Sequence, residues 1–129
     1  MCIDEIMDML DANNPIEVQE WARMLAKKIK CINVFIQPCH REHNKNVWDN
    51  CALILSDRND DELQPYLYDL FRWLQDRNWP GSDIIKKRLN RFEKDELFYY
   101  SLNESIKNAK AQEDEMWLEN LLDLNLNGY

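Results

Sequence analysis

The sequence predicts an all-α fold: a single domain of six or seven helices that pack as stacked antiparallel pairs. Glycine occurs only twice among 129 residues and proline four times, which leaves few residues for the turns of a β-sheet. Apolar residues recur at intervals of three and four along most of the chain, which is the period of an amphipathic helix. Hydrophobic residues make up 45% of the chain, enough for one core without metal or disulfide support.

The first helices are predicted from caps and from one clear stripe. A short helix is expected over residues 3–10, after which Asn14 can cap a second helix and Pro15 suits its first position. Residues 33–44 break the helical period, so we expect a loop there. The second helix carries the most regular apolar stripe of the chain: Val18, Trp21, Ala22, Leu25, Ile29 and Ile32.

A third helix is expected to begin at Lys45 or Asn46 and to end at Leu55, with Trp48 and Cys51 inward. Acidic residues 60–62 favour the start of the next helix, because carboxylates in a first turn complement the helix dipole. Pro65 removes one amide donor and crowds the preceding turn, so we expect a break there. The buried side of this helix is expected to carry Leu63, Tyr66, Leu67, Leu70, Trp73 and Leu74.

The segment WLQDRNWPG at residues 73–81 is the most distinctive local sequence. Asn78 tolerates the left-handed conformation that ends a helix, and Pro80 can open the following one. This predicts a sharp corner formed by Asp76, Asn78, Trp79, Pro80 and Gly81. The later helices are expected to bury Ile84, Ile85, Leu89 and Phe92, then Leu97, Phe98, Leu102, Ile106 and Ala109, then Trp117, Leu118, Leu121 and Leu122.

Two similar segments of the sequence indicate an internal repeat. The sequence DEL at 61–63, with Tyr66 after it, matches DEL at 95–97 with Tyr100 after it, at one constant offset. Each copy is followed by a helix, a polar corner and a second apolar helix. A helix pair that recurs every ~34 residues is typical of helical repeats such as HEAT or TPR units, which stack into an α-α superhelix.

The segment 60–122, with its WLxDxNWPG corner and the closing sequence EMWL at 115–118, resembles a bacterial domain family of unknown function. Its members are HEAT-like helical bundles, so the resemblance implies that fold, and it brings no catalytic residues. We accordingly expect one domain over residues 1–129. It would comprise N-terminal helices over 1–58 and HEAT-like helix pairs with the NWPG corner over 59–129.

Charge restricts the classes of partner. The chain has 24 acidic and 16 basic residues, a formal net charge of −8. This field repels nucleic acids and anionic membranes, so the expected partner is a basic protein. The longest apolar run, 51–55, is far shorter than the roughly 20 residues of a membrane span. The acidic start MCIDE does not fit a secretory signal, so we expect a cytoplasmic protein with free thiols.

The nearest approach to a metal cluster is formed by Cys39, His40 and His43 in the long loop. A structural zinc ion needs four nitrogen or sulfur ligands, usually supplied as two short-spaced pairs. Here Cys31 and Cys51 stand apart in sequence, so the second pair is absent. A polar loop without a bound metal is therefore the prediction, and these three residues are weak candidates.

Carboxylates suggest the one enzymatic alternative. Glu17 and Glu20 lie on neighbouring turns of the second helix, and Asp61 and Glu62 follow later. Carboxylate pairs of this kind hold Mg²⁺ in the all-helical nucleotide pyrophosphohydrolases. The usual double acidic motif on two facing helices is not met. A magnesium-dependent nucleotide hydrolase using these four residues is therefore the alternative hypothesis.

The leading hypothesis is a non-catalytic acidic helical-repeat module that binds another protein, such as an immunity or regulatory protein for a basic partner. The sequence has no glycine-rich phosphate loop, no serine elbow and no His-Glu-x-x-His helix, and no cofactor is expected. Tyr99 and Tyr100 cannot both face inward on one helix, so one of them meets solvent or a partner. The sequence does not decide whether the protein forms a homodimer.

Overall fold

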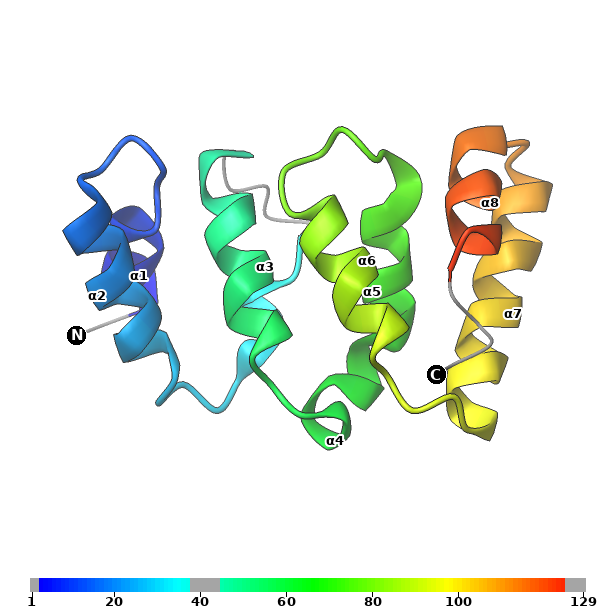
Figure 1. Cartoon of the computed structure of the whole chain (residues 1–129), viewed down its shortest axis with the longest axis horizontal. Coiled ribbons are helices and arrows are strands. Elements are labelled where there is room, and N and C mark those ends of the chain that lie inside the picture. The colour runs from blue at the N-terminus through cyan, green and yellow to red at the C-terminus, as the bar shows by residue number, and fades with distance from the viewer. Residues whose placement is uncertain (1–2, 38–44, 125–129) are drawn as a thin grey trace.

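The computed structural model describes residues 3–37 and 45–124 (Figure 1). Every regular element in these residues is helical, which confirms the all-α fold. The elements are α1 (Ile3–Met9), α2 (Ile16–Ala26), η1 (Ile32–Phe35), η2 (Lys45–Val47), α3 (Trp48–Ser56), α4 (Asp60–Leu63), η3 (Gln64–Tyr66), α5 (Leu67–Arg72), η4 (Trp73–Gln75), α6 (Ser82–Asn90), α7 (Glu96–Ala111) and α8 (Glu115–Leu122). Because α4 to η4 follow one another without a gap, the described residues form seven helical rods besides the short η1, as expected.

The rods pack as side-by-side pairs. In Figure 1, α2, α3, α6 and α8 form one layer and run in one direction, while α1, η1, α5 and α7 run the opposite way behind them. The second members of the pairs begin at Ile16, Trp48, Ser82 and Glu115. These starts recur at nearly equal intervals, so the period seen in the sequence extends over four units. The first member of the second unit is the short 3-10 helix η1.

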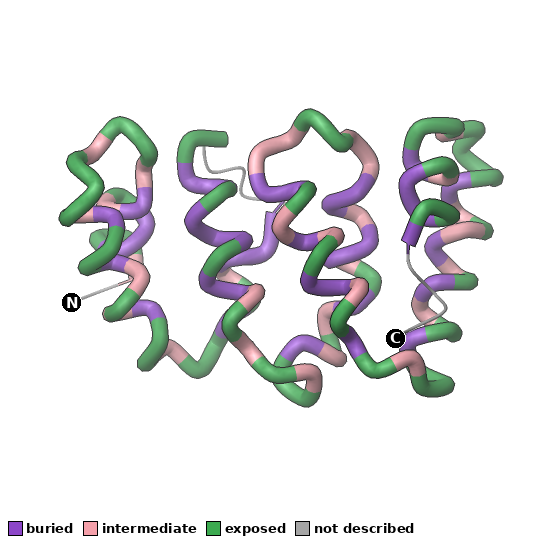
Figure 2. Tube along the Cα trace, in the orientation of Figure 1, coloured by how far each residue is buried: buried purple, intermediate pink, exposed green. Residues whose placement is uncertain are grey.

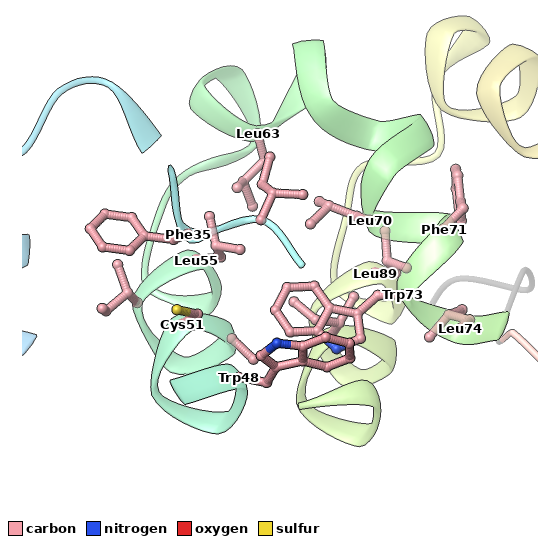
Figure 3. Close-up of a cluster of buried hydrophobic side chains, with 14 of the residues drawn as sticks. Phe35, Trp48, Cys51, Leu55, Leu63, Leu70, Phe71, Trp73, Leu74 and Leu89 are labelled. Atoms are coloured by element: carbon pink, nitrogen blue, oxygen red, sulfur yellow. The ribbon is translucent and has the colours of Figure 1, made fainter. Parts of the chain in front are cut away.

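The buried hydrophobic residues form one core cluster to which every rod contributes, and Figure 2 shows where the buried residues lie along the chain. Its largest fully buried side chains are Trp73, Trp117, Phe35, Phe71 and Phe98. Trp48 of α3 lies beside Trp73 (Figure 3). The two rings meet edge to face, with their centroids 6.0 Å apart. Aromatic pairs of this geometry add to the free energy gained from burial alone. The predicted core positions Trp48, Cys51, Leu70, Trp73, Leu74, Ile85, Leu89, Trp117 and Leu121 are all buried.

The stripe predicted for α2 is correct except at Trp21. Ala22 and Ile32 are buried, and Val18, Leu25 and Ile29 are partly buried. Trp21 is 52% exposed, whereas Gln19, Ala22 and Ala26 point inward. The physical reason lies in α3, whose Asn50 side chain donates hydrogen bonds to Oε1 of Gln19 (2.9 Å) and to the backbone carbonyl of Leu10 (2.7 Å). A polar contact and two small residues thus take the side of the helix opposite Trp21.

The junction between α1 and α2 also differs from expectation. Asn14 was expected to cap α2, but its amide donates to the carbonyls of Asp8 (2.8 Å) and Met9 (3.2 Å). It therefore caps the end of α1. The N-cap of α2 is Pro15, which has no side-chain hydrogen bond. An asparagine between two helices can satisfy either end, and local sequence does not decide between them.

The segment from α3 to α5 follows the prediction closely. η2 and α3 span Lys45 to Ser56, and the 3-10 helix η3 interrupts the next rod at Pro65. The acidic start of α4 belongs to a capping box in which the Asn59 side chain accepts a hydrogen bond from Glu62 N (2.8 Å). Glu62 in turn accepts from Asn59 N (3.5 Å).

The predicted match between Leu63 and Leu97 is wrong. Asn59 caps α4, and Asp95 caps α7 by accepting from Phe98 N (2.9 Å), so the residue with the capping role of Asp95 is Asn59 rather than Asp61. Leu63 is fully buried, but Leu97 is 55% exposed, and Phe98 takes the first fully buried position of α7. Leu122, also predicted to be buried, is exposed on α8. The two DEL segments are identical in sequence, but Asp95 is an N-cap and Asp61 is not.

Within residues 3–37 and 45–124, no helix is both long enough and apolar enough to cross a membrane.

Candidate functional site

The WLQDRNWPG corner joins η4 to α6. Gly81, and not Asn78, adopts the left-handed conformation, with φ of +83°. The Asp76 carboxylate accepts a hydrogen bond from Asn78 N (2.8 Å) and so shapes the turn. Pro80 does not open the helix, because α6 begins at Ser82 and Gly81 is its N-cap. Sequence reasoning placed the corner correctly but assigned its backbone conformation to the wrong residue.

The corner is tightly packed against α3. A Cβ atom at Gly81 would lie 2.9 Å from Ala52 Cβ, from the Trp48 carbonyl and from Cζ2 of Trp73, so only glycine fits there. The indole of Trp73 donates to the Pro80 carbonyl at 2.9 Å. The corner therefore holds α6 on α3, which is a structural role.

Trp79 completes this packing. Its ring lies edge-to-face against Trp48 with centroids 5.4 Å apart. The Lys45 ammonium stands over both rings, 5.7 Å from the centroid of Trp48 and 5.9 Å from that of Trp79. The cation-π contacts add electrostatic attraction at the rim of the core.

The four candidate carboxylates for Mg²⁺ do not gather in one place. Glu17 and Glu20 are exposed on α2, and Asp61 and Glu62 are exposed on α4. Glu62 pairs with Arg58 at 2.8 Å, and this hydrogen bond is the main reason that the pKa of Glu62 is lowered. In the part of the chain that the structure describes, no three His, Cys, Asp or Glu residues could share a metal ion.

The weak zinc candidates Cys39, His40 and His43 lie outside the described residues. Of the flanking cysteines, Cys51 is buried in α3, as expected. Cys31 is exposed, and its Sγ contacts Oδ1 of Asn33 at 2.9 Å.

Arginines that the sequence analysis did not single out connect the carboxyl ends of the helices. Arg58 donates to the carbonyls of Ala26 (2.8 Å) and Ile29 (2.7 Å) at the end of α2. Arg88, buried on α6, donates to the Arg58 carbonyl (2.9 Å) and to the Asp60 carboxylate (2.6 Å). Each of these arginines thus caps the helix end of the preceding unit. The signal for Arg88 was its place between Ile85 and Leu89 on the apolar stripe.

A polar cleft of about 440 Å³ lies beside this arginine series. Two of the charges that line it, Arg58 and Glu62, already bind each other, and the remaining charges are of both signs. The cleft is therefore a consequence of the capping contacts and does not select a ligand by charge. It is lined by Arg23, Lys27, Ile54, Asp57, Arg58 and Glu62.

Two exposed surfaces combine apolar side chains with charge. The first, which we name the α7 face, consists of Leu97, Tyr100, Glu104 and Asn108 of α7 with Tyr68 of α5. Leu97 is 55% and Tyr100 66% exposed, and the Asn108 amide donates to the Tyr68 hydroxyl at 2.8 Å. Tyr100 thus meets solvent, as expected for one of the paired tyrosines.

Charge is concentrated at the same end of the molecule. Residues 93–123 hold nine carboxylates against three lysines, a net charge of −6 out of the total of −8. Residues 45–92 hold eight acidic and eight basic side chains and are neutral. The α7–α8 pair is therefore the acidic end of the protein, and it lies at the opposite end of the row from α1 and α2 (Figure 1).

The second surface, the α2 face, consists of Glu17, Trp21, Met24 and Lys28. All four side chains are exposed, with Trp21 at 52% and Met24 at 57%. It differs from the α7 face in charge, because one acidic and one basic residue flank its apolar centre.

Comparisons with known proteins identify a family but no characterised relative. A family model with the description Domain of unknown function (DUF5071) matches residues 45–127, which is more than half of the chain. No curated protein and no solved structure matched. The matched segment begins just before α3 and includes the corner and the α7 face, whereas the α2 face precedes it. The chain therefore belongs to the DUF5071 family of domains of unknown function.

Proposed function

We propose that this protein is a non-catalytic binding module whose α7 face contacts a basic protein. The observation that carries the proposal is the exposure of Leu97 and Tyr100 inside the most acidic segment of the chain. A folded protein gains nothing in stability from a leucine and a tyrosine held in water. Their exposure has a ready explanation if a partner covers them.

The composition of the α7 face suits protein recognition. Tyrosine is enriched among the residues that dominate binding energy, because it offers a large apolar area and a hydroxyl with little conformational entropy. The surrounding net charge of −6 would attract a basic surface and speed its association. An immunity protein for a basic toxin and a regulatory adaptor both have this physical profile.

The wider setting is part of the proposal. We infer that the four helix pairs form a HEAT-like stack, since each pair packs beside the next as the units of helical-repeat proteins do. Their period of about 33 residues is shorter than that of HEAT units and close to that of TPR units. We also propose a cytoplasmic protein, because the exposed Cys31 suits a reducing compartment. The resemblance of residues 60–122 to a bacterial domain family supports a bacterial origin.

The test compares two matched variants as bait in lysate of the native host. Leu97→Ser with Tyr100→Ser removes the apolar part of the α7 face, and Ile16→Ser removes a similarly exposed apolar side chain on α2. We expect wild type and Ile16→Ser to retain the same basic protein. The Leu97/Tyr100 variant should bind it at least about tenfold more weakly, since loss of a binding hot spot costs more than about 1.4 kcal/mol.

Raising the salt concentration should weaken the wild-type complex, because charges across its rim are screened. Equal binding by the two variants, or capture of an acidic partner, would contradict the proposal. An assay of nucleoside triphosphates with Mg²⁺ checks the enzymatic alternative. Turnover that Glu20→Gln abolishes would replace a binding module with a hydrolase.

A further inference from the structure

The α2 face has a regular spacing that the proposed function does not use. Glu17, Trp21, Met24 and Lys28 are separated by four, three and four positions, so they form one row along α2 and the turn that continues it. This is the spacing of the contact row in a pair of helices. The inward side of α2, formed by Gln19, Ala22 and Ala26, is already covered by the rest of the protein. The row therefore lies on the uncovered side.

The row is complementary to itself. Apolar residues occupy its two central positions, and opposite charges occupy its two ends. Turning a second copy of α2 by half a turn, about an axis between Trp21 and Met24, places Trp21 against Met24 of the second copy. The same rotation places Glu17 of each copy against Lys28 of the other, so each dimer would have two such contacts. A twofold contact needs this self-complementarity, since the same surface serves both partners.

We propose that two copies of this protein associate through antiparallel α2 faces. The charges of the segment 16–28 favour this occupant over a basic partner, because the exposed Glu17 and Glu20 lie in its first half and the exposed Lys27 and Lys28 in its second. Antiparallel copies bring acidic halves against basic halves, whereas parallel copies bring like charges together. Neither Glu17 nor Lys28 forms an ion pair with any of the described residues, so both are available.

The size of the row sets the strength of the dimer. From Glu17 to Lys28 a helix rises by roughly 16 Å. A contact between single helices of this length buries less area than a standard stable interface of about 800 Å² per partner. We therefore expect a dimer that exchanges with monomer at micromolar protein concentrations. α2 and the α7–α8 pair lie at opposite ends of the line of helix pairs (Figure 1). Each dimer would therefore present two α7 faces, one at each far end.

Sedimentation velocity on the full chain tests the proposal through a charge exchange. Glu17→Lys and Lys28→Glu, each alone, place like charges together twice per dimer and should raise the dissociation constant at least about tenfold. The double variant Glu17→Lys with Lys28→Glu restores opposite charges at both contacts, so its dimer should return. A matched exchange on α7, Glu104→Lys with Lys107→Glu and each single change, should leave the dimer unchanged.

Circular dichroism at the same concentrations establishes that each variant is folded. Recovery of the dimer in the double variant also excludes a simple loss of folding as the cause of the single effects. A protein that stays monomeric at every concentration would overturn the proposal. So would a dimer that the single changes do not weaken, or one that the double change does not restore. None of these outcomes bears on binding by the α7 face, which the Leu97/Tyr100 variant tests separately.

Discussion

The Asn50 side chain of α3 donates a hydrogen bond to Gln19 Oε1 of α2 at 2.9 Å, and both residues are buried. The same amide donates to the Leu10 carbonyl, and its oxygen accepts from Nη1 of Arg23 at 2.5 Å. Asn50 lies in the segment that matches the family model, whereas its three partners precede that segment. One side chain therefore joins the N-terminal helix pair to the DUF5071 domain.

Replacing Asn50 by alanine should lower the free energy of unfolding by about 2–3 kcal/mol. The change leaves Gln19 and the Leu10 carbonyl without this donor inside the protein, and an unsatisfied buried polar group costs about 1–3 kcal/mol. Urea denaturation followed by circular dichroism measures the loss. Asn103→Ala on the exposed side of α7 is the control and should change stability by less than about 0.5 kcal/mol. Equal effects of the two substitutions would show that the Asn50 contacts do not form.

Gly81→Ala is expected to be among the most damaging single changes in the chain. The new Cβ would lie 2.9 Å from the Trp48 carbonyl and from Trp73, and φ of +83° is unfavourable for any residue with a side chain. Steric overlap together with this strain should cost at least about 3 kcal/mol. Thermal unfolding gives the readout. The matched control is a substitution at Glu113, which also has a positive φ, of 55°.

Glu113→Gly makes the opposite change at that residue. It relieves a left-handed conformation that costs a non-glycine residue about 1–2 kcal/mol, and the added chain entropy of glycine offsets part of the gain. Its unfolding temperature should therefore stay the same or rise slightly. A fall in unfolding temperature as large as that of Gly81→Ala would contradict this account, because it would show that removing a side chain at a left-handed position destabilises the protein as much as adding one.

Arg58→Gln should alter both stability and its dependence on pH. The Arg58 guanidinium lowers the pKa of Glu62 from its ordinary value of 4.5, so the pair stabilises the protein above about pH 4.5 and loses this effect as pH falls through the folded pKa. In the variant the pKa of Glu62 should rise, which an NMR titration of its side chain measures. At neutral pH, loss of the bonds to Ala26 and Ile29 should also cost about 2 kcal/mol. Lys87→Gln, which removes an exposed ion pair with Asp83, is the control with little expected effect.

The sequence predicted much of this fold because its signals are local. Pro65 interrupts a rod wherever that rod packs, and the acidic start at residues 60–62 belongs to a helix N-terminus in any tertiary setting. Trp48, Trp73 and Trp117 are buried as their stripes predict, since each stripe coincides with the side that faces the other layer.

The errors arose where tertiary contacts chose between two local possibilities. On α2 the predicted stripe is correct for Ala22 but wrong for Trp21, because the contact of Gln19 with Asn50 of α3 lies on the side of the helix opposite Trp21. Asn14 could cap either neighbouring helix, and the two leucines of the repeated DEL sequence take different positions, Leu63 buried and Leu97 exposed. The α7 face was foreseen only as one exposed tyrosine, because Leu97 was assigned to the core.

Trp21 should report association of the α2 faces directly. It is the one tryptophan of the described residues that is more than half exposed, since Trp48, Trp73 and Trp117 are buried and Trp79 is partly covered. If α2 pairs with a second copy, its indole becomes shielded as concentration rises. Quenching by acrylamide should then decrease, and emission should shift to shorter wavelength, over the range in which sedimentation detects the dimer. In Glu17→Lys the same concentrations should leave quenching high, because that charge disfavours pairing without changing the indole. Quenching that is independent of concentration in a sample that sedimentation shows to be dimeric would place the contact on some other surface.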